Sequence, residues 1–522
     1  MNFALFRPSE MKLKLAGTGN LPFLLTLLPI LLHFTLIALY SRNIPWIDDF
    51  YWYFDFLTKI EDAGFSWEAV RILVTSYHNH WHIVQRLILL PVVKMTGGIP
   101  IVPFVWLGNL LYLALFYLLF LRERKGQPTF TPRTAAAAWL FFQPVSYYNF
   151  FECAFFNLPV LLFSFLAIEA FVKHGNRGIG WAVLATFSNG NGMLVWPVAI
   201  LIAAAGKDWK AVARYTAIFA AFSAAYLRAS HGTSGPGRFS LTPFHEIVLY
   251  FLQLTGSIGG LDAWWATTLV GLLLLGIFAL SARTMLKKNP AVWYFTIFLL
   301  MSIAIISLTR REVSGLSAEI VRHYLMFPQI LLVVVACGLT DWKKQGKTMQ
   351  WTLACMAMIL SLVNYGARLP EINGYFALKT ANLLNYEKER KWRLYPPIQG
   401  NEEYRKVNAG TEAAITRGYY RLPALKREYL ASDCAVKPRA DGSVAILASL
   451  PSRMLFKTIM AEVTGPAGQT VILPVDPNFD GFLSWLRRKK GARADMSYAT
   501  QLMNERFVAG EGAACRLFAV TY

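Results

Sequence analysis

Residues 21–40 read LPFLLTLLPILLHFTLIALY, an apolar run without any Asp, Glu, Lys or Arg. A helix of this length is about 30 Å long, which matches the hydrocarbon core of a bilayer. The run is too long for the apolar region of a cleaved signal peptide, and it lacks a small-residue cleavage site. We therefore expect an uncleaved first membrane span, preceded by a cytoplasmic arm, residues 1–20, that carries Arg7, Lys12 and Lys14.

The composition extends this interpretation to the whole chain. Of its 522 residues, 55% are hydrophobic and only 16% are charged, and apolar runs of about twenty residues recur. A soluble core does not explain such runs. The formal net charge of +20 would point to nucleic acid in a soluble chain. Here the basic residues gather in short connectors between apolar runs, as the positive-inside rule describes, and we expect no nucleic-acid partner.

The sequence predicts a polytopic α-helical membrane protein with about eleven spans. With the N-terminal arm in the cytoplasm, the basic connectors at 122–125, 173–177, 207–214, 283–288 and 343–347 become cytoplasmic loops. The expected body covers residues 21–366, with spans at 21–40, 103–121, 135–151, 158–172, 179–189, 192–205, 212–228, 264–282, 291–308, 323–340 and 349–366.

One segment allows two interpretations. Residues 181–205 are long enough for one helix, but the sequence SNGNG at 188–192 favours a turn and predicts two short helices that meet at a polar elbow. A single span would move every later loop to the opposite side of the membrane. With two spans the total is odd, and residues 367–522 lie outside the cytoplasm.

This tail, residues 367–522, reads as a small soluble α+β domain. Its first part is charged, with helical pieces around residues 402–417. Short β-prone runs separated by Gly, Pro and Asp follow from about residue 443. Cys434 and Cys515 are the only cysteines in the tail. An oxidising exterior would permit a bridge between them, and the sequence leaves open whether they approach each other.

The first external loop, residues 41–102, is long and partly apolar. Three amphipathic helices are expected in it, at 51–60, 67–77 and 83–93, lying in the membrane interface and roofing a cavity between spans. The tryptophans expected at headgroup depth are Trp46, Trp52, Trp67 and Trp81.

An acidic pair, Asp48-Asp49, stands at the start of this loop. Carboxylates held close to a bilayer are costly, so a membrane protein that keeps them there commonly uses them. They could act as a general base toward an acceptor hydroxyl, or bind a divalent cation, Mg or Mn, at a phosphate group. The structural alternative is an N-cap of the helix that follows.

Three histidines, His78, His80 and His82, alternate further along the loop. On an extended segment they would point the same way and could bind zinc, whereas on a helix only His78 and His82 share a face. No Cys and no further His at a metal-like spacing completes the set. The other roles considered are hydrogen bonding to a phosphate or sugar, with Arg86 supplying charge, and interfacial packing.

A basic group flanks the loop between the ninth and tenth expected spans. It comprises Arg310, Arg311, Arg322, His323 and Tyr324. Guanidinium groups at the outer membrane edge suit a phosphate or pyrophosphate because they donate in a planar fork and stay charged. The alternative is contact with lipid headgroups.

Four further polar residues are expected to line the same cavity. Glu152 and Asn157 lie near the outer end of the third span, where an ionisable residue is a site hypothesis by default. Glu152 could equally pair with a basic residue as architecture. Asn189 and Asn191 belong to the elbow, which needs such residues in any case.

The order of these features resembles the GT-C superfamily of integral-membrane glycosyltransferases, with an acidic motif in the first external loop, amphipathic loop helices, many spans and an external C-terminal domain. The likeness covers roughly residues 20–370. Within that region, a group of bacterial multi-pass proteins is similar at three motifs: Phe142-Gln143-Pro144 through Asn157, Phe187–Gly192 with Trp196-Pro197, and Arg310 with Arg322-His323-Tyr324.

The resemblance implies transfer of a sugar from a polyprenyl-phosphate donor to a glycan, lipid or protein acceptor at the external face. It implies that Asp48 or Asp49 is the catalytic base or metal ligand. It also implies a Gram-negative inner membrane with a periplasmic tail. Two rival functions are a transporter or flippase, which would also use broken helices around a cavity, and a non-catalytic envelope assembly protein.

Overall fold

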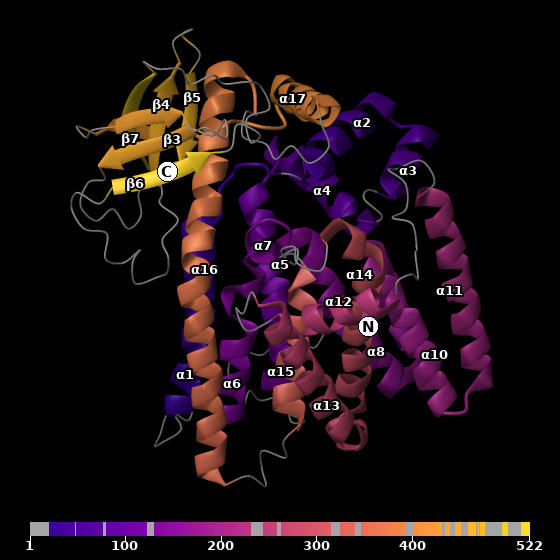
Figure 1. Cartoon of the computed structure of the whole chain (residues 1–522). Helices are drawn as coiled ribbons and strands as arrows, with labels where there is room; N and C mark the ends of the chain where they lie inside the picture. Colours follow the sequence, from indigo (N-terminus) through magenta and orange to yellow (C-terminus); the bar gives the residue numbers. More distant parts are fainter. Residues whose placement is uncertain are drawn as a thin grey trace.

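The computed structural model has a helical body and a smaller C-terminal part that contains two β-sheets (Figure 1). The structure describes residues 20–46, 48–76, 80–122, 130–230, 244–257, 263–314, 324–339, 346–392, 401–430, 434–438, 444–449, 458–465, 468, 470–474, 493–498 and 513–521.

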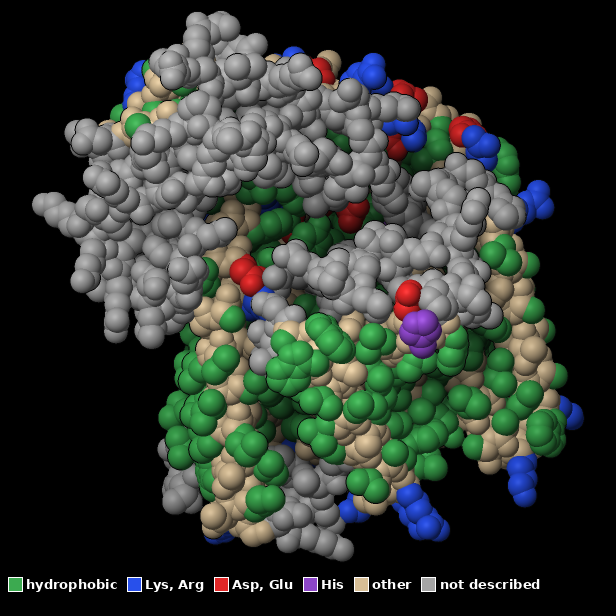
Figure 2. All heavy atoms as spheres, in the orientation of Figure 1, with side chains coloured by type: hydrophobic (Ala, Val, Ile, Leu, Met, Phe, Trp, Pro, Cys, Tyr) green, Lys and Arg blue, Asp and Glu red, His purple; other side chains and the backbone are tan. Residues whose placement is uncertain are grey.

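Six helices within these residues are long and apolar enough to cross a membrane. On α1 (Asn20–Tyr40), Leu24 and Leu31 are 56% and 54% exposed. Figure 2 shows the hydrophobic side chains as a broad belt. Such a belt is stable in lipid and costly in water, so the chain is a helical membrane protein. The other five elements are α5 with its π-helical end (Ile101–Leu121), α8 (Ala154–His174) continued by α9 (Gly178–Ser188), α13 (Trp264–Lys288), α14 (Pro290–Ser314) and α16 (Lys347–Glu389).

The remaining helices of the body are shorter, interrupted or less apolar. The expected span 135–151 is divided, because Gln143 precedes Pro144 and the residue before a proline is disfavoured in a helix. The helix before the break is α6 (Pro132–Phe141), and α7 (Tyr147–Phe151) follows it. The others are α10 (Val195–Ala205), α11 (Trp209–Ser230), α15 (Met326–Leu339) and α12 (Phe244–Gly256), which lies outside every expected span.

The expected elbow is present. α9 ends at Ser188, a 3-10 turn, η6 (Gly190–Leu194), follows, and α10 begins at Val195. A Cβ atom at Gly192 would lie 1.9 Å from the carbonyl oxygen of Ala185. Glycine is therefore required where the turn folds back on α9.

α12 packs closely against α13. A Cβ atom at Gly256 would lie 1.8 Å from the carbonyl oxygen of Thr267, and one at Gly271 would lie 2.1 Å from that of Leu252. The two glycines let the helix backbones touch, as small residues do in membrane helix pairs.

The first loop folds into helices that pack on the body. These are η2 (Phe50–Asp55), α2 (Phe56–Ala63), α3 (Trp67–Val74) and α4 (Ile83–Thr96). Of the four tryptophans expected at headgroup depth, Trp46, Trp52 and Trp81 are instead buried, and only Trp67 is exposed. The three buried indoles fill the protein interior because the loop folds onto the body, where aromatic rings from several elements surround them.

α16 connects the helical body to the C-terminal sheets without a break. It runs from Lys347 to Glu389, so the boundary expected at residue 366 lies inside one helix. Its last turns pack against the larger sheet. There the Asn385 amide nitrogen donates to the Ile472 carbonyl at 2.8 Å, and the Ile472 amide donates back to the Asn385 side-chain oxygen at 2.7 Å.

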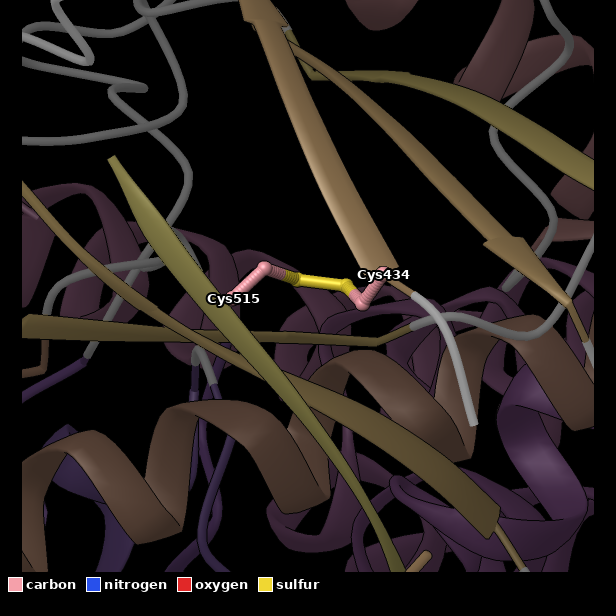
Figure 3. The surroundings of a disulfide bond; sticks show 2 residues. All are labelled: Cys434 and Cys515. Carbon is pink, nitrogen blue, oxygen red and sulfur yellow. A yellow bond between two sulfur atoms is a disulfide. The ribbon is translucent and has the colours of Figure 1, made fainter. Parts of the chain in front are cut away.

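The C-terminal part contains α17 (Asn401–Thr416) and two antiparallel sheets, ordered β1-β7-β4-β5 and β2-β3-β6. Cys434 and Cys515, the pair singled out in the sequence, form a disulfide between β2 and β7 and so join the two sheets (Figure 3). The strands are β1 (Lys426–Tyr429), β2 (Cys434–Pro438), β3 (Val444–Ser449), β4 (Thr458–Thr464), β5 (Thr470–Pro474), β6 (Arg493–Tyr498) and β7 (Ala514–Thr521).

Candidate functional site

The acidic pair forms a tight turn between α1 and η2. The Trp46 amide donates to Asp49 Oδ2 at 3.0 Å, and the Asp49 amide donates to the Trp46 carbonyl at 2.9 Å. Asp49 is only 2% exposed, whereas Asp48 is partly exposed. Asp49 occupies the N-cap position of η2, but its side chain makes no capping hydrogen bond to that helix. The carboxylate therefore points back to the turn, and the helix-cap interpretation does not describe it.

Glu152 and Lys379 form a buried ion pair close to this turn. Lys379 Nζ lies 2.5 Å from Glu152 Oε1, and the two side chains are 2% and 4% exposed respectively. Glu152 stands in the break between α7 and α8, and Lys379 comes from α16. The ammonium also lies 5.4 Å from the ring centre of Phe376. Glu152 was expected to line the cavity or to pair with a basic residue, and the structure shows the pairing.

The two carboxyl groups share one electrostatic environment. Burial raises the pKa of Asp49 well above its ordinary value, the charge of Glu152 raises it further, and Lys379 and the Trp46 amide oppose the rise. Burial also raises the pKa of Glu152, against the effect of Lys379. One ammonium thus serves two buried acids. Because Lys379 bonds Glu152, Asp49 is the carboxyl left better suited to exchange a proton.

A chain of asparagine side chains lies beside the cluster. Asn157 Nδ2 donates to Asn149 Oδ1 at 2.9 Å, and Asn189 Nδ2 donates to Asn157 Oδ1 at 3.1 Å. The Asn191 amide donates to Asn189 Oδ1 at 3.2 Å. The structure thus brings together Asn157, Asn189 and Asn191, as expected. It uses them to fasten the elbow to α7 and α8.

The histidines are placed differently from one another. His78 lies outside the described residues, His80 is half-buried and His82 is buried. His82 Nδ1 lies 3.0 Å from the Ser188 carbonyl oxygen, and its ring packs against Trp52. Burial lowers the pKa of His82 well below its ordinary value, as do nearby charges. The ring is therefore neutral at physiological pH.

The described residues fit a divalent cation poorly. They contain no group of three His, Cys, Asp or Glu side chains arranged to bind a metal. At the acid cluster, the Lys379 ammonium already supplies the positive charge beside Glu152. Asp48 and Asp49 remain the residues predicted to bind Mg or Mn. The chemistry proposed for the cluster does not require a metal.

Arg86 has structural contacts that the sequence did not indicate. Its Nη1 donates to the carbonyl oxygens of Ile72, Leu73 and Thr75 at 3.1, 2.9 and 2.6 Å, at the C-terminal end of α3. The guanidinium also lies 4.9 Å from the ring centre of Phe56. These contacts assign Arg86 to the packing of the first loop, while its predicted role in phosphate binding stays a prediction.

Most side chains of the predicted basic group, Arg310 to Tyr324, are not described by the structure. Arg322 and His323 are not described, and neither are the side chains of Arg310 and Arg311. The backbone places Arg310 about 30 Å along α14 from its first residue. Tyr324 is buried at the start of α15. The expected meeting of these arginines with the acidic pair stays a prediction.

Sequence reasoning missed the polar face of α16, which includes Lys379. Ser361 Oγ donates to the Trp139 carbonyl at 2.7 Å, and Asn364 Nδ2 donates to Gln143 Oε1 at 2.5 Å. Arg368, only 4% exposed, pairs with Glu371. The signal was present, because polar residues recur every three or four positions beyond residue 360, as on one face of a helix.

The arrangement combines a buried carboxyl whose pKa is raised with a buried ion pair. Figure 2 shows a hollow above the apolar belt, with hydrophobic walls and acidic side chains inside it. Chemically, the cluster can accept a proton from a hydroxyl group and hold negative charge out of water. Comparison with family models, curated proteins and solved structures gave no match to this chain.

Proposed function

We propose that this chain is a GT-C-type membrane glycosyltransferase. It transfers a sugar from a polyprenyl-phosphate donor to an acceptor hydroxyl at the external face of a bacterial inner membrane. The observation that carries the proposal is the meeting of Asp49, Glu152 and Lys379, from three distant parts of the chain, at one buried position. Burying ionisable residues costs desolvation free energy, so a membrane protein that keeps such residues buried commonly uses them in its function.

In the proposed reaction, Asp49 accepts the proton of the acceptor hydroxyl as its oxygen attacks the anomeric carbon. The bond from that carbon to the phosphate oxygen breaks, and its electron pair leaves with the phosphate. Because a phosphate leaving group needs little protonation, a single base suffices. Lys379 opposes the rise that burial causes in the pKa of Glu152 and offsets the negative charge of both acids. A single displacement inverts the anomeric configuration.

The donor phosphate is assigned to three arginines. Arg310 and Arg311 belong to the last turns of α14, and Arg322 precedes α15 in the sequence. An apolar groove with a volume of about 260 Å³ lies between α12 and α14, and α14 is also the helix that carries Arg310 and Arg311. Its walls suit a hydrocarbon chain. The lining residues are Phe244, Ile247, Val248, Phe251, Ala304, Ser307 and Leu308.

A transporter or flippase is the second candidate, favoured by one observation. Within the described residues, helices are interrupted between α6 and α7, between α7 and α8 and between α9 and α10. Discontinuous helices of this kind form substrate sites in transporters. Asp49, a buried acid with a raised pKa, fits sugar transfer better, because transfer needs a group that accepts a proton and passage of a lipid does not.

The test is transfer by the purified full chain in liposomes. A panel of radiolabelled polyprenyl-phosphate sugars is supplied with a lipid-linked glycan acceptor. We expect transfer to be lost in Asp49→Asn and retained in Asp55→Asn, a matched exposed acid of the same loop that pairs with Lys59. Full activity in both Asp48→Asn and Asp49→Asn would overturn the assignment, as would retention of anomeric configuration. Movement of labelled lipid between leaflets without transfer would favour the flippase.

A further inference from the structure

The segment that follows α16 packs against the first loop beside the acidic turn. We call α17 and the turn after it, residues 401–420, the C-terminal cover. Arg417 pairs with Glu61 at 2.9 Å and with Asp62 at 2.8 Å, both on α2. The carbonyl of Tyr419 accepts a hydrogen bond from the Ile99 amide at 2.7 Å. The cover is thus fastened to both ends of the helical part of the first loop.

Within the cover, Tyr420 reaches the turn that carries the acidic pair. Its hydroxyl donates to the Asn43 carbonyl at 2.8 Å, and its side chain is only 2% exposed. The ring lies 5.1 Å from that of Phe54 in η2. Burial raises the pKa of Tyr420 well above its ordinary value, and the charge of Asp49 adds to the rise. Tyr420 therefore contacts both sides of the acidic turn and lies within the electrostatic reach of Asp49.

A second aromatic residue supports the same place. Trp392, which follows α16, stacks on Tyr386 at 4.7 Å between ring centres and packs edge-on against Phe50 at 5.1 Å. Its indole nitrogen donates to Thr411 Oγ1 in α17 at 3.0 Å. Phe50 is the residue directly after Asp49. The cover and the end of α16 therefore hold the start of η2 in place.

We propose that Tyr420 is a positioning residue for Asp49, so that the C-terminal cover is part of the site. The hydrogen bond to Asn43 fixes the chain before the acidic turn, and the ring contact with Phe54 fixes the chain after it. Loss of the hydroxyl frees the Asn43 end of the turn and admits water to the carboxyl. The role in sugar transfer rests on the proposed function, but the positioning of Asp49 does not.

The expected change in Asp49 has a definite sign. Burial is the largest cause of its raised pKa, so hydration of the turn lowers that pKa toward the ordinary value. The ring of Tyr420 is retained in Tyr420→Phe, which leaves the packing against Phe54. Tyr419→Phe is the matched control, since it removes a hydroxyl from the neighbouring residue on the side of Glu61. The other titratable groups that act on Asp49 or respond to its charge are Asp48, Glu152, Lys379, Tyr53, Tyr148 and Cys153.

The first measurement needs no substrate. An apolar carbodiimide modifies carboxyl groups in their protonated form, and peptide mass spectrometry reads the modification of Asp49 across a pH series. We expect the wild type and Tyr419→Phe to label Asp49 up to a high pH. In Tyr420→Phe the midpoint should fall by about one unit or more. An unchanged midpoint in Tyr420→Phe would overturn the proposal whether or not the chain transfers sugar.

The second measurement is the pH profile of transfer. We expect the kcat of Tyr420→Phe to fall on the order of tenfold to a hundredfold, with KM for the donor unchanged and the acidic limb, along which activity rises as Asp49 loses its proton, moved to lower pH. A purely structural role would lower the amount of folded protein and leave the profile in place, which would contradict the proposal. Transfer that survives Asp48→Asn and Asp49→Asn would end the proposed function, while the labelling result for Tyr420 would still hold.

Discussion

Replacement of Lys379 by methionine tests the acid cluster directly. Methionine keeps an unbranched apolar stem but removes the ammonium, and Asp49 and Glu152 then stay buried without a compensating charge. Breaking a buried ion pair by removing one partner costs about 3–5 kcal/mol. Since about 1.4 kcal/mol corresponds to a factor of ten, we expect the unfolded fraction of Lys379→Met to rise roughly a hundredfold to several thousandfold.

This loss of stability depends on pH. Lys379 lowers the pKa of both Asp49 and Glu152, so its removal raises two values that burial already holds above the ordinary range. A carboxyl with a raised folded-state pKa favours folding when protonated. That contribution is complete below the unfolded-state pKa of about 4 and is lost as pH rises through the folded-state pKa. The deficit of Lys379→Met should therefore be smallest near pH 4 and grow above it.

Pulse proteolysis in detergent across a pH series measures the unfolded fraction. Lys388→Met is the matched control, because Lys388 lies on the same helix and pairs with Glu462 at 2.9 Å while 37% exposed. Its loss should cost about 1 kcal/mol or less. The double variant Glu152→Gln/Lys379→Met should recover part of the deficit. Equal deficits in Lys379→Met and Lys388→Met, or a deficit that does not vary with pH, would refute the reasoning.

Three further changes follow from the packing. Replacing both Cys434 and Cys515 by serine should destabilise the C-terminal sheets by up to about 4.5 kcal/mol of loop entropy for their separation of 81 residues, read as faster proteolysis of that part alone. Gly256→Val should separate α12 from α13 and cost about 1–3 kcal/mol or more. The control Gly276→Val, where no atom lies within 4 Å of the added carbon, should cost far less by thermal unfolding. Arg86→Gln should speed hydrogen exchange at the C-terminal end of α3, because the charged hydrogen bonds lost there are each worth about 1.5–3 kcal/mol; unchanged exchange would contradict this role.

The sequence was sufficient for features that depend on local chemistry. The apolar run of α1, the polar elbow after Ser188 and the cysteine pair were all indicated by residue types and spacing. The acidic pair and Glu152 were both singled out because ionisable groups are rare beside a membrane. Their meeting could not be derived, because it depends on how the first loop folds back over the body.

Lys379 escaped prediction for a related reason. Hydropathy falls after residue 366, and a fall in hydropathy looks like the end of a membrane domain even when the helix continues. α12 and the buried tryptophans of the first loop were likewise missed or misplaced, because aromatic and amphipathic runs fit both an interface and a protein interior. Long-range packing decided between the two environments.

Because α16 is one continuous helix, a movement of the C-terminal sheets is transmitted directly to Lys379 in the acid cluster. The first residue of α16 and Lys379 are separated by about 48 Å of helix. If the Lys347 end is the pivot, a tilt of one degree moves Lys379 by about 0.8 Å. Catalytic groups tolerate displacements of only about 0.5 Å. A molecule that pulls on the sheets would therefore change the surroundings of Asp49, the proposed proton acceptor, without touching it.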